Sequence, residues 1–157
     1  MNILLIAVGK TDLNSISHLC DDYFKRIKRY INFEFKIIKD IKTTAKTNES
    51  IQKKLEGEKI LSELSSSDFV VLLDEKAKEF TSREFASFLE KQMNMSTKNL
   101  IFVIGGAYGF SQEVYDRANL KFSLSQMTFS HQIIRIIFAE QLYRAFTIIN
   151  NEPYHHD

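Results

Sequence analysis

A glycine-rich turn follows a run of apolar residues in the second half of the chain. Residues 100–104 are all apolar, which is typical of a strand buried on both faces of a sheet. Gly105-Gly106-Ala107-Tyr108-Gly109 comes next, and Ser111 then begins a helical pattern. Glycines at such a turn let the backbone approach a ligand, while the following helix presents free N–H groups. A tight turn that binds nothing is the alternative, and the spacing is not the Gly-x-Gly-x-x-Gly dinucleotide pattern.

Histidine and cysteine, the usual ligands of transition metals, do not occur here in a ligand pattern. The chain has four histidines, of which His155 and His156 are adjacent, and this spacing does not suit zinc. The one cysteine, Cys20, excludes an internal disulfide and a cysteine-rich metal site. We therefore expect no metal and a reducing, cytoplasmic location.

Size and composition favour one ordinary globular domain over residues 1–157. Hydrophobic residues make up 44% of the 157 residues and charged residues 26%, which argues against disorder. The first apolar run is too short for a signal peptide and lacks a basic leader. No segment approaches the roughly 20 apolar residues that span a bilayer, so no membrane partner is expected.

The charge is unevenly distributed although the formal net charge is only +1. Between Lys25 and Lys54 there are ten lysines and arginines but only three acids. A solvated surface is the ordinary explanation of such a window. A surface that contacts the phosphate backbone of a nucleic acid is the alternative, because clustered cations release counterions on binding.

Strand and helix patterns alternate along the chain. Apolar or alternating runs predict five strands, at residues 2–8, 33–37, 69–73, 100–104 and 120–124. The second is expected at a sheet edge and the third inside the sheet. Helical periodicity fills the intervals, with a capping box at Thr81 and Glu84 and a cap at Ser111. The sequence thus predicts an α/β sandwich on a mostly parallel sheet.

The last helix, residues 131–150, is apolar around nearly its whole circumference. Only Arg135, Glu140, Gln141 and Arg144 interrupt its apolar residues. A surface helix normally has one apolar stripe and one polar face, so this helix must be covered on two sides. We expect a symmetric homodimer through it, with burial inside one protomer as the alternative.

Several short motifs follow one another along the chain. In order, they are Ala7-Val8-Gly9-Lys10, the glycine turn, Leu124-Ser125-Gln126-Met127-Thr128-Phe129, His131 with Arg135, Glu140-Gln141-Leu142-Tyr143-Arg144-Ala145 and Pro153-Tyr154-His155. This ordered set resembles the small SPOUT-class ribosomal RNA methyltransferases, in particular the RlmH type, over essentially the full length. The resemblance implies methylation of N3 of a pseudouridine in 23S ribosomal RNA, on the assembled ribosome. It also implies a C-terminal trefoil knot, which periodicity alone would not suggest.

The same resemblance implies that S-adenosyl-L-methionine binds in the knot, against three loops at a dimer interface. Carried over to this sequence, the cofactor-binding residues are Leu73, Gly105, Gly106, Gly109, Leu124, Ser125, Gln126, Met127, Thr128 and Phe129. Apolar contacts from Leu73 and the last of these loops suit an adenine. The absence of a side chain at Gly105 suits a close approach of the cofactor.

On the substrate side, the resemblance makes Arg144, Tyr154 and His155 the leading catalytic candidates, followed by His131 and Arg135. Arginine can hold a phosphate or stabilise the oxygen of an ionised uracil ring. Tyrosine can stack on a base, and a neutral histidine can accept the N3 proton.

Each of these residues also has a purely structural interpretation. Arg144 can pair with Glu140 of its own helix or of a partner. His131 can be a helix cap or a packed core histidine, and the C-terminal residues can fray. A non-catalytic α/β module that binds RNA or a nucleotide in ribosome assembly is the alternative function. It would follow if Ser130, where relatives often have proline, and the Ala107-Tyr108 pair altered the pocket. A flavodoxin-like enzyme that acts on small molecules is the third possible function.

Overall fold

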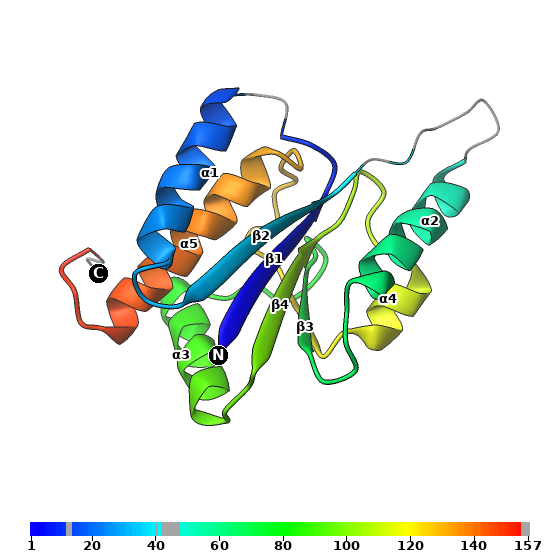
Figure 1. Ribbon diagram of the computed structural model, residues 1–157. Helices are drawn as coiled ribbons and strands as arrows, with labels where there is room; N and C mark the ends of the chain where they lie inside the picture. Colours follow the sequence, from blue (N-terminus) through cyan, green and yellow to red (C-terminus); the bar gives the residue numbers. More distant parts are fainter. Residues whose placement is uncertain (12–13, 40, 42–47, 155–157) are drawn as a thin grey trace.

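The computed structural model describes residues 1–11, 14–39, 41 and 48–154, and in this part five strands alternate with five helices (Figure 1). The strands are β1 (Asn2–Val8), β2 (Asn32–Ile38), β3 (Phe69–Leu73), β4 (Asn99–Ile104) and β5 (Leu120–Phe122). The helices are α1 (Asn14–Ile27), α2 (Glu49–Ser62), α3 (Ser82–Asn94), α4 (Gln112–Arg117) and α5 (Ile133–Ile149). All five predicted strands are present.

The strands form one sheet in the order β2-β1-β4-β3-β5, and every neighbouring pair is parallel. β2 lies at an edge and β3 inside the sheet, which confirms both predictions. The last strand is shorter than expected. It stops at Phe122 because the Ser123 hydroxyl bonds to the backbone of Ser125 and turns the chain away.

Helices cover both faces of the sheet, so the predicted α/β sandwich is confirmed (Figure 1). α1, α3 and α5 lie on one face, where Leu5 and Phe102 contribute to a large core. α2 and α4 lie on the other face over a smaller core that includes Ile6 and Val103. The trefoil knot stays a prediction.

Gly57, in the middle of α2, has a packing role. A Cβ atom at this position would lie 2.4 Å from the hydroxyl oxygen of Ser111, at the start of α4. Glycine therefore allows α2 and α4 to approach closely. Ser111 occupies the N-cap position as predicted, but its side chain makes no cap hydrogen bond and is buried against α2. The predicted capping box is present: Thr81 Oγ1 accepts from Glu84 N at 3.2 Å, and Glu84 Oε2 accepts from Thr81 N at 2.7 Å.

α5 is covered only in part by its own protomer. It packs between α1 and α3, and this contact buries one side of the helix. The residues of that side are Phe138, Ala139, Leu142, Ala145 and Phe146. Ile133 is 40% exposed, while Ile136 and Ile137 are half-buried. Burial within the protomer therefore explains one of the two apolar sides.

Candidate active site

A cleft of about 670 Å³ opens at the carboxyl ends of β3 and β4. Its walls come from the loops after these two strands, the segment after β5, the start of α5 and one residue each of α2 and α4. The predicted cofactor residues among its lining are Leu73, Gly105, Gly106, Gly109, Leu124, Ser125, Met127, Thr128 and Phe129. Gln126 is not among the lining residues. The structure thus brings three segments together that are up to 56 residues apart in the chain.

The glycine turn after β4 owes its sequence largely to internal packing. Gly109 N donates to Gly106 O at 3.1 Å, and Gly109 has a φ of +78°, which favours glycine. A Cβ at Gly105 would lie 3.1 Å from the Phe110 ring, and one at Gly106 would lie 2.4 Å from the Glu56 carboxylate. The missing side chains at positions 105 and 106 thus make room for protein groups, whereas the sequence suggested room for a ligand.

Carboxylates of the loop after β3 hold the segment after β5 in place. Glu79 accepts a hydrogen bond from the backbone N–H of Gln126 at 2.7 Å. Glu75 accepts one from the Thr128 hydroxyl at 2.8 Å. The shape of this cleft wall therefore depends on side chains from another loop, and Gln126 contributes through its backbone.

Asp74 is a cleft residue that the motif comparison missed. Its Oδ2 accepts from the Tyr115 hydroxyl at 2.9 Å, and its Oδ1 accepts from the backbone N–H of Lys76 at 3.0 Å. Burial, together with the bond to Asp74, raises the pKa of Tyr115 to about 12. The position of Asp74, directly after a buried strand, was the available signal.

His131 lines the cleft and is exposed, which excludes the interpretation as a packed core histidine. It precedes α5, whose first turn is held by Ser130. The Ser130 hydroxyl accepts from Ile133 N at 3.3 Å, and its carbonyl accepts from Ile134 N at 3.1 Å. Ser130 thus fixes the turn before α5 through two hydrogen bonds, although the N-cap position itself belongs to Gln132.

Arg144 and Tyr154 lie toward the other end of α5 and do not line the cleft. Arg144 Nε donates to Glu140 Oε1 at 3.0 Å. This is the pairing within the helix that the sequence offered as a purely structural role for Arg144. That bond raises the pKa of the Arg144 guanidinium. The guanidinium lies 4.9 Å from the centre of the Tyr154 ring, and burial raises the pKa of Tyr154. His155 lies outside the described residues.

Arg135 is not a substrate-side residue. Its side chain is fully buried, and Nη2 donates to the carbonyls of Val8 at 2.7 Å and Gly9 at 2.8 Å. Nη1 donates to the Thr11 hydroxyl at 2.5 Å. Arg135 therefore joins α5 to the carboxyl end of β1, and the prediction that placed it near the substrate is wrong for this protomer.

Comparison with known proteins identifies the family. A family model described as "Predicted SPOUT methyltransferase" matches residues 1–155. The chain belongs to the SPOUT methyltransferase family. Curated relatives named ribosomal RNA large subunit methyltransferase H include those from Christiangramia forsetii and Flavobacterium johnsoniae, each 57% identical over 99% of both chains. The relative from Parabacteroides distasonis is 54% identical over the full length of both chains.

Two further features of this SPOUT methyltransferase concern its described residues. Among them, no helix is long and apolar enough to cross a membrane. No cluster of three or more His, Cys, Asp or Glu side chains that could hold a metal ion occurs in the same part of the chain.

Proposed function

We propose that this protein transfers a methyl group from S-adenosyl-L-methionine to N3 of a pseudouridine in 23S ribosomal RNA, on the assembled ribosome in the cytoplasm. The observation that carries the proposal is the cleft, since the residues around Leu73, Gly105 and Leu124 meet there as the family resemblance requires. The full-length similarity to relatives named ribosomal RNA large subunit methyltransferase H favours ribosomal RNA as substrate and favours an enzyme over a non-catalytic module.

The cleft suits such a cofactor in size and chemistry. A volume of about 670 Å³ lies within the range of small-molecule pockets. Leu73, Leu124 and Met127 offer apolar contacts, and the turn at Gly105 and Gly106 leaves backbone groups near the lining. The Asp74 carboxylate offers an acceptor that is fixed in place by Tyr115. S-adenosyl-L-methionine supplies an activated methyl group on a sulfonium when bound.

The protein must then place N3 of the base and take up its proton. His131 is the described residue best placed for the proton, because it is exposed at the cleft and a neutral imidazole nitrogen can accept a proton. His155 is the second candidate base. Arg144 and Tyr154 would hold the base or its phosphate, by ion pairing and stacking.

A homodimer would bring the cleft and the substrate candidates Arg144 and Tyr154 together. Within one protomer Arg144 and Tyr154 do not line the cleft, so in this proposal a second copy places its C-terminal segment over it. The exposed or half-buried isoleucines of α5 (Ile133, Ile136 and Ile137), with Phe129 beside the cleft, are available for that contact. Sedimentation of the purified protein would give a mass of about twice 18.3 kDa.

A complementation test links the dimer to activity. One variant carries Arg144→Ala and the other Leu124→Asp, which puts a carboxylate on the cleft wall. Each alone is expected to lose most of its activity, while co-expressed chains regain part of it, because a mixed dimer keeps one intact site. Equal inactivity of the mixed sample, with both variants folded and dimeric, would show that each site uses a single protomer.

The decisive test of function is a methylation assay with intact ribosomes, isolated subunits and naked 23S RNA. Mass spectrometry should find one added methyl group on a pseudouridine, with intact ribosomes as the best substrate. Calorimetry should detect S-adenosyl-L-methionine binding to the protein alone. Absence of both methylation and cofactor binding would instead support a non-catalytic RNA-binding module.

A further inference from the structure

Four cations at the end of α1 form an exposed group, which we call the α1 basic turn: Lys25, Arg26, Lys28 and Arg29. We propose that the α1 basic turn binds the phosphate backbone of the substrate RNA, with Arg26 as the residue that joins this surface to the C-terminal segment. The inference rests on the proposed function, because it names how the same substrate is held. It assigns a role to α1, which supplies nothing to the cleft.

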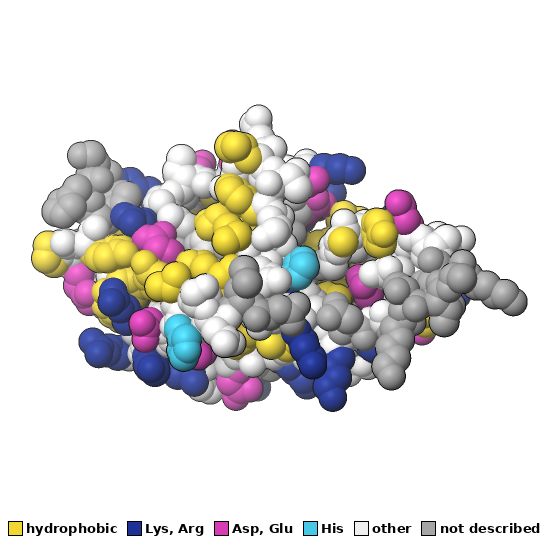
Figure 2. Space-filling model, turned by 90° about the horizontal axis from the view of Figure 1, so that it is seen from above, with side chains coloured by type: hydrophobic (Ala, Val, Ile, Leu, Met, Phe, Trp, Pro, Cys, Tyr) yellow, Lys and Arg dark blue, Asp and Glu magenta, His cyan; other side chains and the backbone are white. Residues whose placement is uncertain are grey.

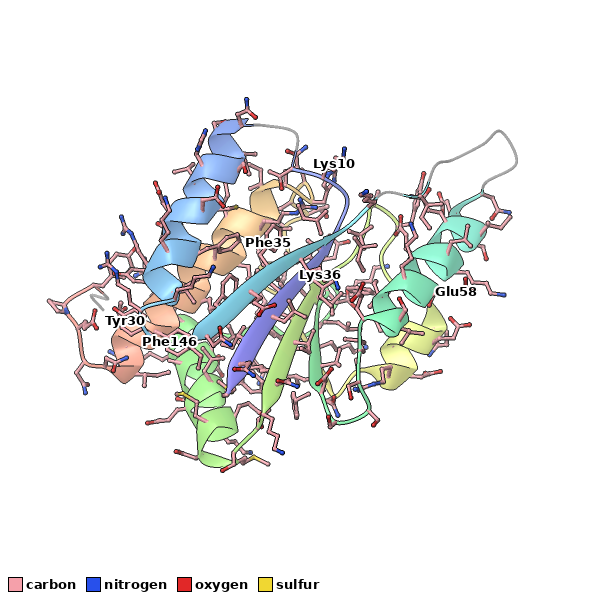
Figure 3. The ribbon with its side chains drawn as sticks, in the orientation of Figure 1. Lys10, Tyr30, Phe35, Lys36, Glu58 and Phe146 are labelled. Carbon is pink, nitrogen blue, oxygen red and sulfur yellow. The ribbon has the colours of Figure 1, made fainter. Side chains whose placement is uncertain are left out.

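The structure separates the α1 basic turn from the other cations of the basic stretch between Lys25 and Lys54. Lys36 lies on β2 (Figure 3), where it forms an ion pair with Glu63. Lys53 belongs to α2 on the opposite face of the sheet and lines the cleft. Lys42 and Lys46 lie outside the described residues. The contiguous basic stretch of the sequence is therefore several separate groups in space.

The charges of the α1 basic turn are largely uncompensated. Among the described residues its one ion pair is Lys25 with Asp22, at 3.7 Å between two exposed side chains. Arg26, Lys28 and Arg29 have no carboxylate within ion-pair distance in that part of the chain. The exposed Asp21 and Asp22, one turn earlier on α1, are the nearest acids in sequence. Seen from the carboxyl end of the sheet, Lys and Arg side chains gather at the lower left, on the side of α1 and α5 (Figure 2).

Aromatic rings connect Arg26 to the C-terminal segment. Its guanidinium carbon lies 5.6 Å from the centre of the Tyr23 ring and 5.7 Å from that of Tyr143. Tyr143 in turn packs edge-on against Tyr154, with ring centres 4.8 Å apart. Arg26 and the candidate substrate residue Tyr154 thus contact the same ring.

The segment that carries Tyr154 is also fixed to the end of α1. The Tyr30 hydroxyl donates to Glu152 at 2.7 Å, and the Tyr30 ring stacks on Phe146 at 5.7 Å between centres (Figure 3). The α1 basic turn and the C-terminal segment therefore form one surface with a fixed geometry.

RNA is the partner that this chemistry fits. Clustered Lys and Arg side chains bind phosphates, while arginine planes and tyrosine rings stack on unpaired bases. Arg144, the other arginine of the cluster, is already paired with Glu140. Arg26, which contacts the same ring as Tyr154, has no carboxylate partner among the described residues, so it can receive a phosphate without breaking an ion pair.

The test compares two double variants with the same loss of charge. Lys28→Gln/Arg29→Gln removes half of the α1 basic turn, and Lys91→Gln/Lys98→Gln removes two exposed lysines outside it, one on α3 and one just before β4. For the first we expect the KM for ribosomes to rise about tenfold and the slope of log affinity against log salt to fall by about 2, because two phosphate contacts are lost. The kcat and the Kd for S-adenosyl-L-methionine should stay within twofold. The control should match the wild type.

Arg26 is tested separately. Arg26→Gln should raise the KM for ribosomes, and Arg26→Lys should recover only part of it, because lysine keeps the charge but loses the planar contact. If the wild type is active and all α1 variants bind ribosomes as it does, this inference is overturned but the proposed function is not. Tighter binding to anionic phospholipid vesicles than to ribosomal RNA would also overturn it. An inactive wild type that still binds ribosomes through these residues would contradict the proposed function and leave the surface in place.

Discussion

The two ends of the parallel sheet differ in how their polar groups are used. At the amino ends, Asn2, Asn32 and Asn99 lie in register and are linked by side-chain hydrogen bonds. Asn32 Nδ2 donates to Asn2 Oδ1 at 3.1 Å, Asn2 Nδ2 donates to Asn99 Oδ1 at 3.2 Å, and Asn99 Nδ2 donates to Asp68 Oδ1 at 2.9 Å. At the carboxyl ends, Asp74, Thr128 and His131 surround an open cleft instead.

This difference shows how one sheet serves stability at one end and chemistry at the other. The asparagine ladder pairs polar groups with one another and thereby fixes the register of three strands. The cleft end instead holds polar groups at the wall of an open cleft, with Asp74 and Thr128 fixed by hydrogen bonds from neighbouring loops. It also exposes apolar side chains, since Met127 is 71% exposed and Tyr108 45%. Exposed apolar groups beside a pocket are typical of a surface that a partner or ligand covers.

Substitution of Arg135 should cause the largest loss of stability, because this buried charge joins α5 to the carboxyl end of β1. Arg135→Met would leave the buried carbonyls of Val8 and Gly9 without their donor. We expect a loss of about 3 kcal/mol or more in the free energy of unfolding. Urea titration at fixed protein concentration measures it. Arg144→Met on the same helix is the control and should cost about 1 kcal/mol. If Arg135→Met lost no more stability than Arg144→Met, Arg135 would not anchor α5 to β1.

Gly106 tests whether the glycine turn is set by packing behind the cleft. Gly106→Ala would bring a Cβ to 2.4 Å from the Glu56 carboxylate, so we expect a loss of about 1–3 kcal/mol and weaker binding of S-adenosyl-L-methionine. Gly109→Ala has open space around its Cβ but a φ of +78°, and should cost about 1–2 kcal/mol from backbone strain alone. Adding Glu56→Ala should recover stability in Gly106→Ala and not in Gly109→Ala. Equal responses would contradict the packing explanation.

Substitutions at the amino ends of the strands should change the free energy of unfolding but not cofactor binding. Asn99→Ala removes the acceptor of Asn2 and the donor to Asp68, and we expect a loss of about 1–2 kcal/mol. The Kd for S-adenosyl-L-methionine, measured by calorimetry, should change less than twofold. Asn94→Ala, at the exposed end of α3, is the control and should stay within about 0.5 kcal/mol of the wild type. A change in cofactor affinity with Asn99→Ala would mean that the two ends are coupled.

Much of the fold could be predicted because the strands have simple patterns. Residues 69–73 and 100–104 are continuous apolar runs of strand length, which is typical of strands buried on both faces of a sheet. The asparagine ladder was also readable in principle, since Asn2, Asn32 and Asn99 each begin an apolar or alternating run. Their in-register contact, however, depends on the order of the strands, which local patterns do not give.

The site was predictable only where a motif marks it. The segments around Leu73, Gly105 and Leu124 do meet, but that expectation came from the family resemblance. Arg135 was misjudged because its role came from the motif that it shares with His131, while its burial depends on carbonyls more than 120 residues away. Glu56 and Tyr115 gave no signal, since each acts through a contact with a distant loop.

Tyr115 gives the smallest expected effect. It tests whether the part of the cleft formed by Tyr115 and Asp74, here called its floor, is held more firmly than the exposed rim at Met127 and Tyr108. Tyr115→Phe removes the hydrogen bond to Asp74 and should cost about 1 kcal/mol in the free energy of unfolding at pH 8. The pKa of Tyr115 is raised from 10.0 to about 12 in the folded protein, so the neutral phenol stabilises the fold below pH 10 and this contribution is lost as the pH rises toward 12. The difference between wild type and Tyr115→Phe should therefore shrink across this window. A difference that stays constant up to pH 12 would mean that the Tyr115 hydroxyl does not depend on Asp74, and the floor of the cleft would then be as loosely held as its exposed rim.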